Sequence, residues 1–279
     1  MKYNTIIDGD GIAYAISAVM EQSYMKLLPP IDLVSNEEYT DLIIHLNMSL
    51  EWNVCESLDS HCISLLENKI REINEYVDAD KMILLIGGSN TYRKGIYKHY
   101  KESRSKTPKL QSLTRIKKLL QRRYNASWVK GIETDDACTI TYNHYRNSGD
   151  PIILVHTDKD LKQCAGEHLK YPTYYDKQFT KYSVSEDEAL LHLLRQHVQG
   201  DTIDGVKGLE GRGEKYVDQL ISTNTLVPQR VLEEYIIRYG RIHGMYQFSK
   251  NFLLVHMLTN SEDINFTVPG WTKLKRTEG

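Results

Sequence analysis

The stretch Gly131-Ile132-Glu133-Thr134-Asp135-Asp136-Ala137 places three carboxylates within four positions. It lies between a short apolar run, residues 126–130, and a segment of helical character, residues 137–146. Acidic residues at a helix start cap free N–H groups and face the positive end of the helix dipole. Carboxylates this close also repel each other, and a hard cation such as Mg²⁺ or Mn²⁺ relieves that repulsion. The stretch alone leaves helix capping and a metal site both open.

Working outward, acidic residues also follow two other predicted strands. The apolar run 3–7 ends at Asp8-Gly9-Asp10, and the run 152–156 ends at Thr157-Asp158-Lys159-Asp160. The run 81–86 ends instead at Gly87-Gly88-Ser89-Asn90, and a further short strand is predicted at 168–171. Apolar residues at three- and four-residue steps predict helices between these strands, over 12–25 and most of 41–77, with a loop at 29–40.

This alternation predicts an α/β fold with a mostly parallel sheet flanked by helices. Ligands gather at the carboxyl ends of the strands in such sheets. We therefore expect the acidic residues after the strands to meet at one edge, which favours a metal site over scattered helix caps.

The composition is that of a globular protein, with 279 residues, 41% hydrophobic residues and a net charge of −2. Four scattered cysteines indicate a reducing, cytoplasmic location, and no apolar run is long enough to cross a membrane. We expect an α/β core over 1–182 and a helical region over 183–279, in which Ser185 caps the first helix. The tail after residue 268 is expected to be loose.

Positive charge is concentrated between Arg93 and Lys130, where 13 Lys and Arg residues face a single acid, Glu102. Tyrosines are interleaved at its start, in Tyr92-Arg93-Lys94 and Tyr97-Lys98-His99-Tyr100-Lys101. This pattern is typical of phosphate pairing combined with base stacking on a single strand. A solvated surface helix normally mixes charge signs, so the segment favours a nucleic-acid contact.

A second distinctive segment, residues 200–215, carries five glycines in 14 positions together with Lys207, Arg212 and Lys215. Glycines let backbone N–H groups approach a phosphate closely, and a plain interhelical turn needs fewer of them. Neither a phosphate loop of the Gly-Lys-Ser/Thr type nor a dinucleotide fingerprint fits the spacing. The segment predicts a hairpin that holds a DNA backbone.

Taken in order, these motifs resemble those of the 5′→3′ exonuclease and flap-endonuclease family, over about residues 3–220. The similarity is greatest to phage exonucleases and to the 5′-nuclease domain of bacterial DNA polymerase. It implies a PIN-like core, a helical arch at about 90–128, and a helix–hairpin–helix region that binds duplex DNA, often around K⁺. It also favours a phage origin, with the host cytoplasm as the location.

The resemblance also implies residue roles. Ligands of one ion would be Asp8, Glu133, Asp135 and Asp136, and ligands of a second ion Asp158, Asp160, Asp201 and Asp204. Gateway residues that steer the scissile phosphate would be Arg93, Tyr100, Lys101 and Arg104. DNA contacts are expected from Lys94, Lys98, Lys106, Gly205, Gly208, Gly211, Arg212, Gly213 and Lys215. Asp10 has no fixed family role and is expected to support the ligands from behind.

One departure stands out, because the family usually has an aspartate at the end of the second strand. Gly88 occupies that place here, and Asp10 or a water could substitute for the missing carboxylate. The expected function is a Mg²⁺- or Mn²⁺-dependent 5′→3′ exonuclease, with two ions and with cleavage of flaps and RNA–DNA hybrids. We expect a monomer that contacts no membrane. A non-catalytic DNA-structure-binding protein and a PIN-type ribonuclease remain as alternatives.

Overall fold

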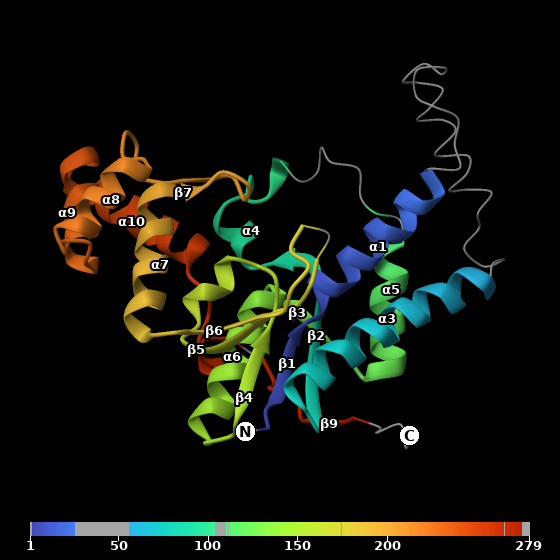
Figure 1. Ribbon diagram of the computed structural model, residues 1–279. Coiled ribbons are helices and arrows are strands. Elements are labelled where there is room, and N and C mark those ends of the chain that lie inside the picture. Colours follow the sequence, from blue (N-terminus) through green and yellow to red (C-terminus); the bar gives the residue numbers. More distant parts are fainter. Residues whose placement is uncertain are drawn as a thin grey trace, which may run out of the picture.

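The computed structural model describes residues 2–25, 56–103, 110, 112–173, 175–264 and 266–274 (Figure 1). The loop predicted at 29–40 and the first part of the helix predicted at 41–77 lie outside these residues. Among the described helices, none combines the length and the apolar character needed to cross a membrane.

The centre of the molecule is a mostly parallel sheet in the order β3-β2-β1-β4-β5-β6. Its strands are β1 (Asn4–Asp8), β2 (Lys81–Thr91), β3 (Ser127–Gly131), β4 (Ile152–Val155), β5 (Gly166–Lys170) and β6 (Thr180–Val184). The pairs within β1 to β5 are parallel, and β6 is antiparallel to β5. The predicted α/β architecture is confirmed, although β6 was not predicted.

The chain builds this sheet outward from β1 in two directions. It adds β2 and β3 on one side and then returns to add β4 and β5 on the other. The strand order therefore reverses between β1 and β4. Open parallel sheets bind their ligands outside the carboxyl ends of the strands at such a switch point.

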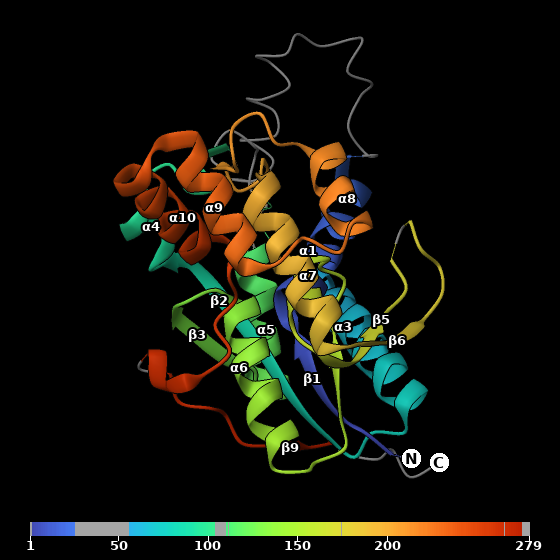
Figure 2. The same ribbon diagram turned by 90° about the vertical axis from the view of Figure 1, so that its left-hand side faces the viewer.

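Helices cover both faces of the sheet (Figures 1 and 2). Helices α1 (Gly9–Met25), α3 (Glu56–Val77) and α5 (Leu113–Tyr124) share one apolar core, into which β1 contributes Ile7. Helix α6 (Thr134–Asn147) lies on the other face, in the core that contains Ile6. Neighbouring residues of a buried strand point to opposite faces, so both are apolar.

Helix α5 corrects the predicted extent of the arch. Residues 90–128 were expected to form it, but Ile116 and Leu120 of α5 are fully buried in the core of α1 and α3. The last part of the basic segment therefore belongs to the nuclease core. At its start, the short helix α4 (Arg93–Ile96) follows β2.

The helical region begins with α7 (Glu186–Gln199), which Ser185 caps as predicted. A small hairpin of β7 (Gly200–Asp201) and β8 (Val206–Lys207) follows, and then α8 (Glu214–Ser222), α9 (Pro228–Tyr239) and α10 (Arg241–Val255). These elements enclose a core of their own, to which Val198, Val217 and Tyr235 belong. The helices and the hairpin were predicted, whereas the path of the chain after α10 was not.

After α10 the chain returns to the sheet. Strand β9 (Thr272–Lys273) pairs antiparallel with the start of β2, and Trp271 packs on Tyr145 of α6 with ring centroids 4.5 Å apart. The tail was expected to be loose from residue 268, and this prediction is wrong for residues 268–274. The region after 182 is therefore not a separate body, since its end completes the core.

Candidate active site

The predicted metal ligands gather at the carboxyl end of the sheet. One pocket is lined by Glu133, Asp135, Asp136, Asp158, Asp160, Asp201 and Asp204, together with Arg93, Tyr100 and Lys101. Asp8 ends β1 beside them and is close enough to Asp158 and Asp135 for mutual repulsion to raise pKa values. We call this group of carboxylates the acidic pocket. Residues from β1, α6, the loop after β4 and the β7–β8 hairpin meet here.

Local backbone geometry fixes three of these carboxylates. One oxygen of Asp8 accepts the N–H of Asp10 at 3.0 Å, and one oxygen of Asp158 accepts the N–H of Asp160 at 2.8 Å. Asp201 accepts the N–H groups of Ile203 and Asp204 at 2.8 and 3.1 Å. In each case the second carboxylate oxygen has no hydrogen-bond partner among the described residues. Such oxygens suit a hard cation.

The pKa values of the acids record their crowding. Burial and then the charge of Asp10 raise the pKa of Asp8 to about 7. Burial and then Asp158 raise the pKa of Asp160 to about 7, and the same two causes raise the pKa of Asp135 well above its usual range. Asp158 is thus the common neighbour of the other acids. A bound divalent cation would favour the charged form of each.

Five members of the acidic pocket have no ion-pair partner among the described residues: Asp8, Asp135, Asp158, Asp160 and Asp201. The donor set fits Mg²⁺ or Mn²⁺, because it consists of carboxylate oxygens without thiolate or imidazole. No three acidic, histidine or cysteine side chains in the described ranges converge tightly enough to enclose one ion as they stand. Mg²⁺ is commonly held by one or two carboxylates and several waters, which this arrangement allows.

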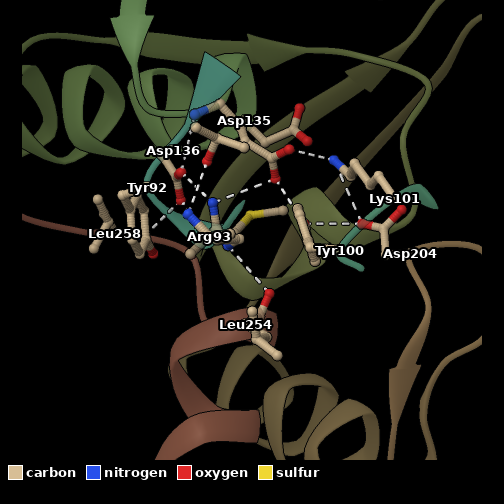
Figure 3. A network of polar contacts seen from close by, with 12 residues as sticks. Tyr92, Arg93, Tyr100, Lys101, Asp135, Asp136, Asp204, Leu254 and Leu258 are labelled. Atoms are coloured by element: carbon tan, nitrogen blue, oxygen red, sulfur yellow. Dashed lines mark hydrogen bonds and ion pairs between the residues drawn. The ribbon is translucent and has the colours of Figure 1, made fainter. Parts of the chain in front are cut away.

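Asp136 and Arg93 form a buried ion pair (Figure 3). The two N–H···O bonds between them measure 2.5 and 2.8 Å. Asp136 also accepts the backbone N–H groups of Glu133 and Leu258, so its oxygens are fully used. In this arrangement Asp136 serves the pair with Arg93, and its role as a metal ligand stays a prediction.

Arg93 is only 2% exposed, and besides Asp136 it donates to the carbonyl groups of Leu254 and His256, at the end of α10. It also contacts Glu133 at 3.3 Å. These contacts tie α6 to the C-terminal segment, while Arg93 still lines the pocket. Its gateway role stays a prediction.

Tyr100 and Lys101 join the acidic pocket from the start of the basic segment (Figure 3). The hydroxyl of Tyr100 lies 2.9 Å from Glu133 and 3.0 Å from Asp204. The Lys101 ammonium contacts Glu133 and lies 3.4 Å from Asp204. Burial raises the pKa of Glu133, but Lys101 and then Arg93 outweigh it, so the pKa of Glu133 is lowered. Lys101 thus acts as a cation within the pocket.

Helix capping and the acidic pocket turn out to coexist. Glu133 is the N-cap of α6, and Asp136 accepts from the Glu133 backbone to complete a capping box. Asp135, between them, is the member of the stretch that lines the pocket without an ion pair. Helix capping therefore falls on Glu133 and Asp136, whereas Asp135 lines the pocket without a capping role.

Gly88, where the family aspartate is missing, lies inside β2, and Asp10 comes close to its neighbour Gly87. Asp10 accepts the N–H of Gly87 at 3.0 Å and the hydroxyl of Thr134 at 2.8 Å. Lys117 of α5 pairs with Asp10 at 2.8 Å and donates to the Gly87 carbonyl at 2.6 Å. Asp10 therefore links Gly87 of β2 to the first residue of α6, and its role behind the metal ligands stays a prediction.

The β7–β8 hairpin uses its glycines in two ways. A side chain at Gly200 or Gly208 would collide with the backbone of the other, so these two residues allow close packing. The DNA contact of Gly208 stays a prediction. Gly205 turns the hairpin with a φ of +72° against the His99 carbonyl. Gly211 and Gly213 face open space.

The remaining residues predicted to contact DNA differ in their exposure and in their ion pairs. Lys94, Lys98 and Lys215 are exposed, whereas Arg212 pairs with Glu234 at 3.3 Å and stacks on Tyr216. Arg104 and Lys106 lie outside the described residues. Sequence reasoning missed Gln196 of α7, which donates to Asp160 at 2.7 Å, and no motif marks it. It also gave no role to Lys117, which was counted only as part of the basic segment.

Fold and site together define an α/β nuclease domain of the PIN-like class. A family model described as the 5′-3′ exonuclease, N-terminal resolvase-like domain, matches residues 56–197, which are 142 of the 279 residues. The chain belongs to this family, and the expected resemblance is confirmed.

Two solved structures share the fold. The T5 D15 protein co-crystallised with metal ions has a TM-score of 0.62 at 14% identity, covering 92% of this chain and 90% of that one. The bacteriophage T5 flap endonuclease in a pseudo-enzyme–product complex with DNA and metal ions has a TM-score of 0.51 at 12% identity, covering 91% and 99%.

Two bacterial DNA polymerases I match part of the sequence. The enzyme of Rhizobium leguminosarum is 30% identical over 142 residues, and that of Chloroflexus aurantiacus is 28% identical over 144 residues. These matches cover 48% and 45% of this chain but only 14% and 15% of the polymerases. The chain thus spans a small part of the length of these relatives.

Proposed function

We propose that this chain is a divalent-cation-dependent 5′ nuclease that hydrolyses phosphodiesters of DNA at 5′ ends and flaps, and in RNA–DNA hybrids. The observation that carries the proposal is the group of five acids without an ion pair at the switch point of the sheet. Membership of the 5′-3′ exonuclease family supports it, as does the fold shared with the T5 flap endonuclease that was crystallised with DNA and metal ions.

Asp158 has a central place in the proposed site. Its charge raises the pKa values of Asp8 and Asp135 on one side and of Asp160 on the other. We therefore assign Asp8, Asp135 and Asp158 to one ion, and Asp158, Asp160, Asp201 and Asp204 to a second. Ions bound there would activate water and stabilise charge on the scissile phosphate.

Lys101 is the residue that we assign to the phosphate itself. Its ammonium lies between Glu133 and Asp204, and its side chain is 18% exposed, so it can reach a bound substrate. With divalent cations held by the carboxylates, the Lys101 ammonium would offset charge that develops on the phosphate. Tyr100 holds Glu133 and Asp204 in place.

The hairpin and α8 are proposed to bind the backbone of duplex DNA. Gly211 and Gly213 have open space around them, and Lys215 is exposed without an ion pair among the described residues. Contacts of this kind fix the register of a protein on DNA without reading its sequence. A K⁺ ion at the hairpin remains part of the proposal.

A non-catalytic DNA-structure-binding protein is the second candidate. The specific observation in its favour is the part of β2 around Gly88, which supplies no carboxylate, while the nearby Asp10 is neutralised by Lys117. The five acids without an ion pair argue against it, because a protein that only binds DNA has no use for unneutralised carboxylates at the binding surface.

A panel of labelled substrates tests the proposal. A 5′-flap duplex, a blunt duplex, an RNA–DNA hybrid and a single-stranded RNA are incubated with the chain in Mg²⁺, Mn²⁺ or EDTA. We expect cleavage of the DNA substrates and the hybrid, dependent on the divalent ion. Binding of the flap without turnover in either ion would favour the non-catalytic protein, and cleavage of the RNA alone would favour a PIN-type ribonuclease.

A further inference from the structure

A second cavity, of about 300 Å³, adjoins the acidic pocket. It lies between α4, β8, α9 and α10, and Figure 2 shows α4 beside α10. Val206 and Leu254 line both cavities, so they form the wall between them. A strand held at the acidic pocket would therefore have this cavity as its immediate neighbour.

The lining of this cavity combines aromatic rings with two ammonium groups. Tyr97, the residue after α4, and Tyr239, at the end of α9, contribute rings. Lys207 and Lys250 contribute positive charge. The Lys250 ammonium lies 5.6 Å from the centre of the Tyr97 ring. We call this second cavity the lysine cavity.

Neither lysine has an ion pair within the described part of the chain. Helices α4 and α10 and strand β8 contain no acidic residue. The two glutamates of α9, Glu233 and Glu234, pair with Arg230 at 3.8 and 2.6 Å. Burial and then the charge of Lys207 lower the pKa of Lys250, as expected for two like charges near each other. An anion would relieve this repulsion.

The backbone around Lys207 is fixed, so the cavity is preformed. The side chain of Asn251 donates to the Lys207 carbonyl at 2.6 Å and to the Tyr235 hydroxyl at 2.9 Å. A buried residue of α10 thus holds β8 against the helix. Preformed sites lose less free energy in ordering when a ligand binds.

We propose that the lysine cavity binds one nucleotide of the single-stranded 5′ segment of the substrate, next to the scissile phosphate. The phosphate lies between Lys207 and Lys250, and the base packs against Tyr97 or Tyr239. A base reaches an aromatic ring only when it is unpaired, and a cavity of this size admits no duplex. This inference rests on the proposed nuclease function for the identity of the strand.

Binding of a fluorescent hexathymidylate, measured by anisotropy in EDTA, tests the phosphate contact. The double variant Lys207→Gln/Lys250→Gln is compared with Lys273→Gln, which changes an exposed lysine on β9. We expect affinity about tenfold below wild type in the double variant, with a slope of log K against log salt smaller by about 0.7, as for one phosphate contact. Lys273→Gln should match wild type. Equal affinity and slope in both variants would overturn the proposal.

Two further measurements test whether the cavity binds a base and whether it requires a single strand. A hexamer that lacks its bases should bind wild type more weakly than hexathymidylate, and Tyr97→Leu should reduce that difference. A blunt duplex should bind the double lysine variant as tightly as it binds wild type. Abasic binding as tight as that of hexathymidylate, or an equal loss for the duplex, would contradict a single-stranded nucleotide site.

Because EDTA prevents cleavage, the binding measurements do not depend on whether the chain cleaves DNA. A chain that binds as expected but never cleaves would contradict the proposed nuclease and leave the cavity assignment intact. A chain that cleaves but whose double lysine variant binds hexathymidylate normally would contradict the cavity assignment alone. Circular dichroism of each variant establishes that it is folded.

Discussion

The acids at the carboxyl end of the sheet fall into two groups. Asp10, Glu133, Asp136 and Asp204 each pair with a cation of the chain: Lys117, Lys101 or Arg93. Asp8, Asp135, Asp158, Asp160 and Asp201 have no such partner among the described residues. We call them the paired and unpaired acids. The sequence neighbours Asp135 and Asp136 fall on opposite sides of this division.

Carboxylates in the two groups therefore have different roles. Removing the partner of a paired acid destabilises the fold, since it leaves an uncompensated buried charge. Unpaired acids destabilise the metal-free protein by mutual repulsion. Bound cations would remove that repulsion, which is consistent with a role as metal ligands. We therefore expect a loss of activity when an unpaired acid is replaced, and a loss of stability when an ion pair is broken.

The largest effect is expected from an unpaired acid. Asp135→Ala should reduce Mg²⁺-dependent cleavage by at least about a thousandfold, since it removes a ligand on which several kcal/mol of charge stabilisation depends. DNA binding in Ca²⁺ should remain, and unfolding in urea should require slightly more denaturant without metal. The exposed Asp187→Ala is the matched control. Cleavage near the wild-type rate would remove Asp135 from the site.

Breaking the main pair should act on stability instead. Arg93→Met should lower the free energy of unfolding by about 3–5 kcal/mol, because Asp136 would remain buried without its cation. Urea denaturation measures this, with the exposed Lys94→Met as control. Combining Arg93→Met with Asp136→Leu should recover part of the loss. An unchanged unfolding curve for Arg93→Met would break the division between the two groups.

Lys101 bridges the two functions and should show a smaller effect on rate. Lys101→Met should slow cleavage by about a hundredfold, as is typical when one donor to a developing negative charge is removed. Binding of a flap substrate in Ca²⁺ should change little. Single-turnover kinetics with Lys98→Met as the exposed control separates the two quantities. A weaker affinity with a normal rate would make Lys101 a binding residue.

The smallest effect concerns pH. The pKa of Asp160 is about 7 in the folded chain and 3.8 unfolded, so its carboxyl stabilises the fold below pH 4 and loses that stabilisation as pH rises toward 7. In EDTA, Asp160→Asn should therefore gain stability relative to wild type between pH 4 and 7. Urea midpoints of both proteins across this range measure it. A constant difference would mean that Asp160 is not crowded by other acids.

The sequence predicted the acidic pocket but not this division. Strand ends and the order of motifs were enough to bring Asp8, Asp135 and Asp158 together, because parallel strands share one carboxyl edge. The role of Asp136 depends on Arg93, and Arg93 in turn on carbonyl groups near residue 255. Such distant backbone contacts leave no pattern in a linear sequence.

The misjudged segments are helix α5 and the two strands β6 and β9. Helix α5 was taken for arch because its charges are conspicuous, although Ile116 and Leu120 give it an apolar face for α1. Strands β6 and β9 are short, and both have exposed residues, so neither carries a clear apolar alternation. Their pairing is determined by the sheet edge that they meet.

Metal binding measured directly by calorimetry tests the central claim, that the unpaired acids form the cation site. Mn²⁺ is titrated at pH 7 into wild type, Asp158→Asn and the exposed control Asp187→Asn, without DNA. We predict binding to wild type and to the control, and a loss of at least tenfold in affinity for Asp158→Asn, since Asp158 neighbours both proposed ions. Absence of Mn²⁺ binding to wild type, or equal binding to Asp158→Asn, would contradict the account.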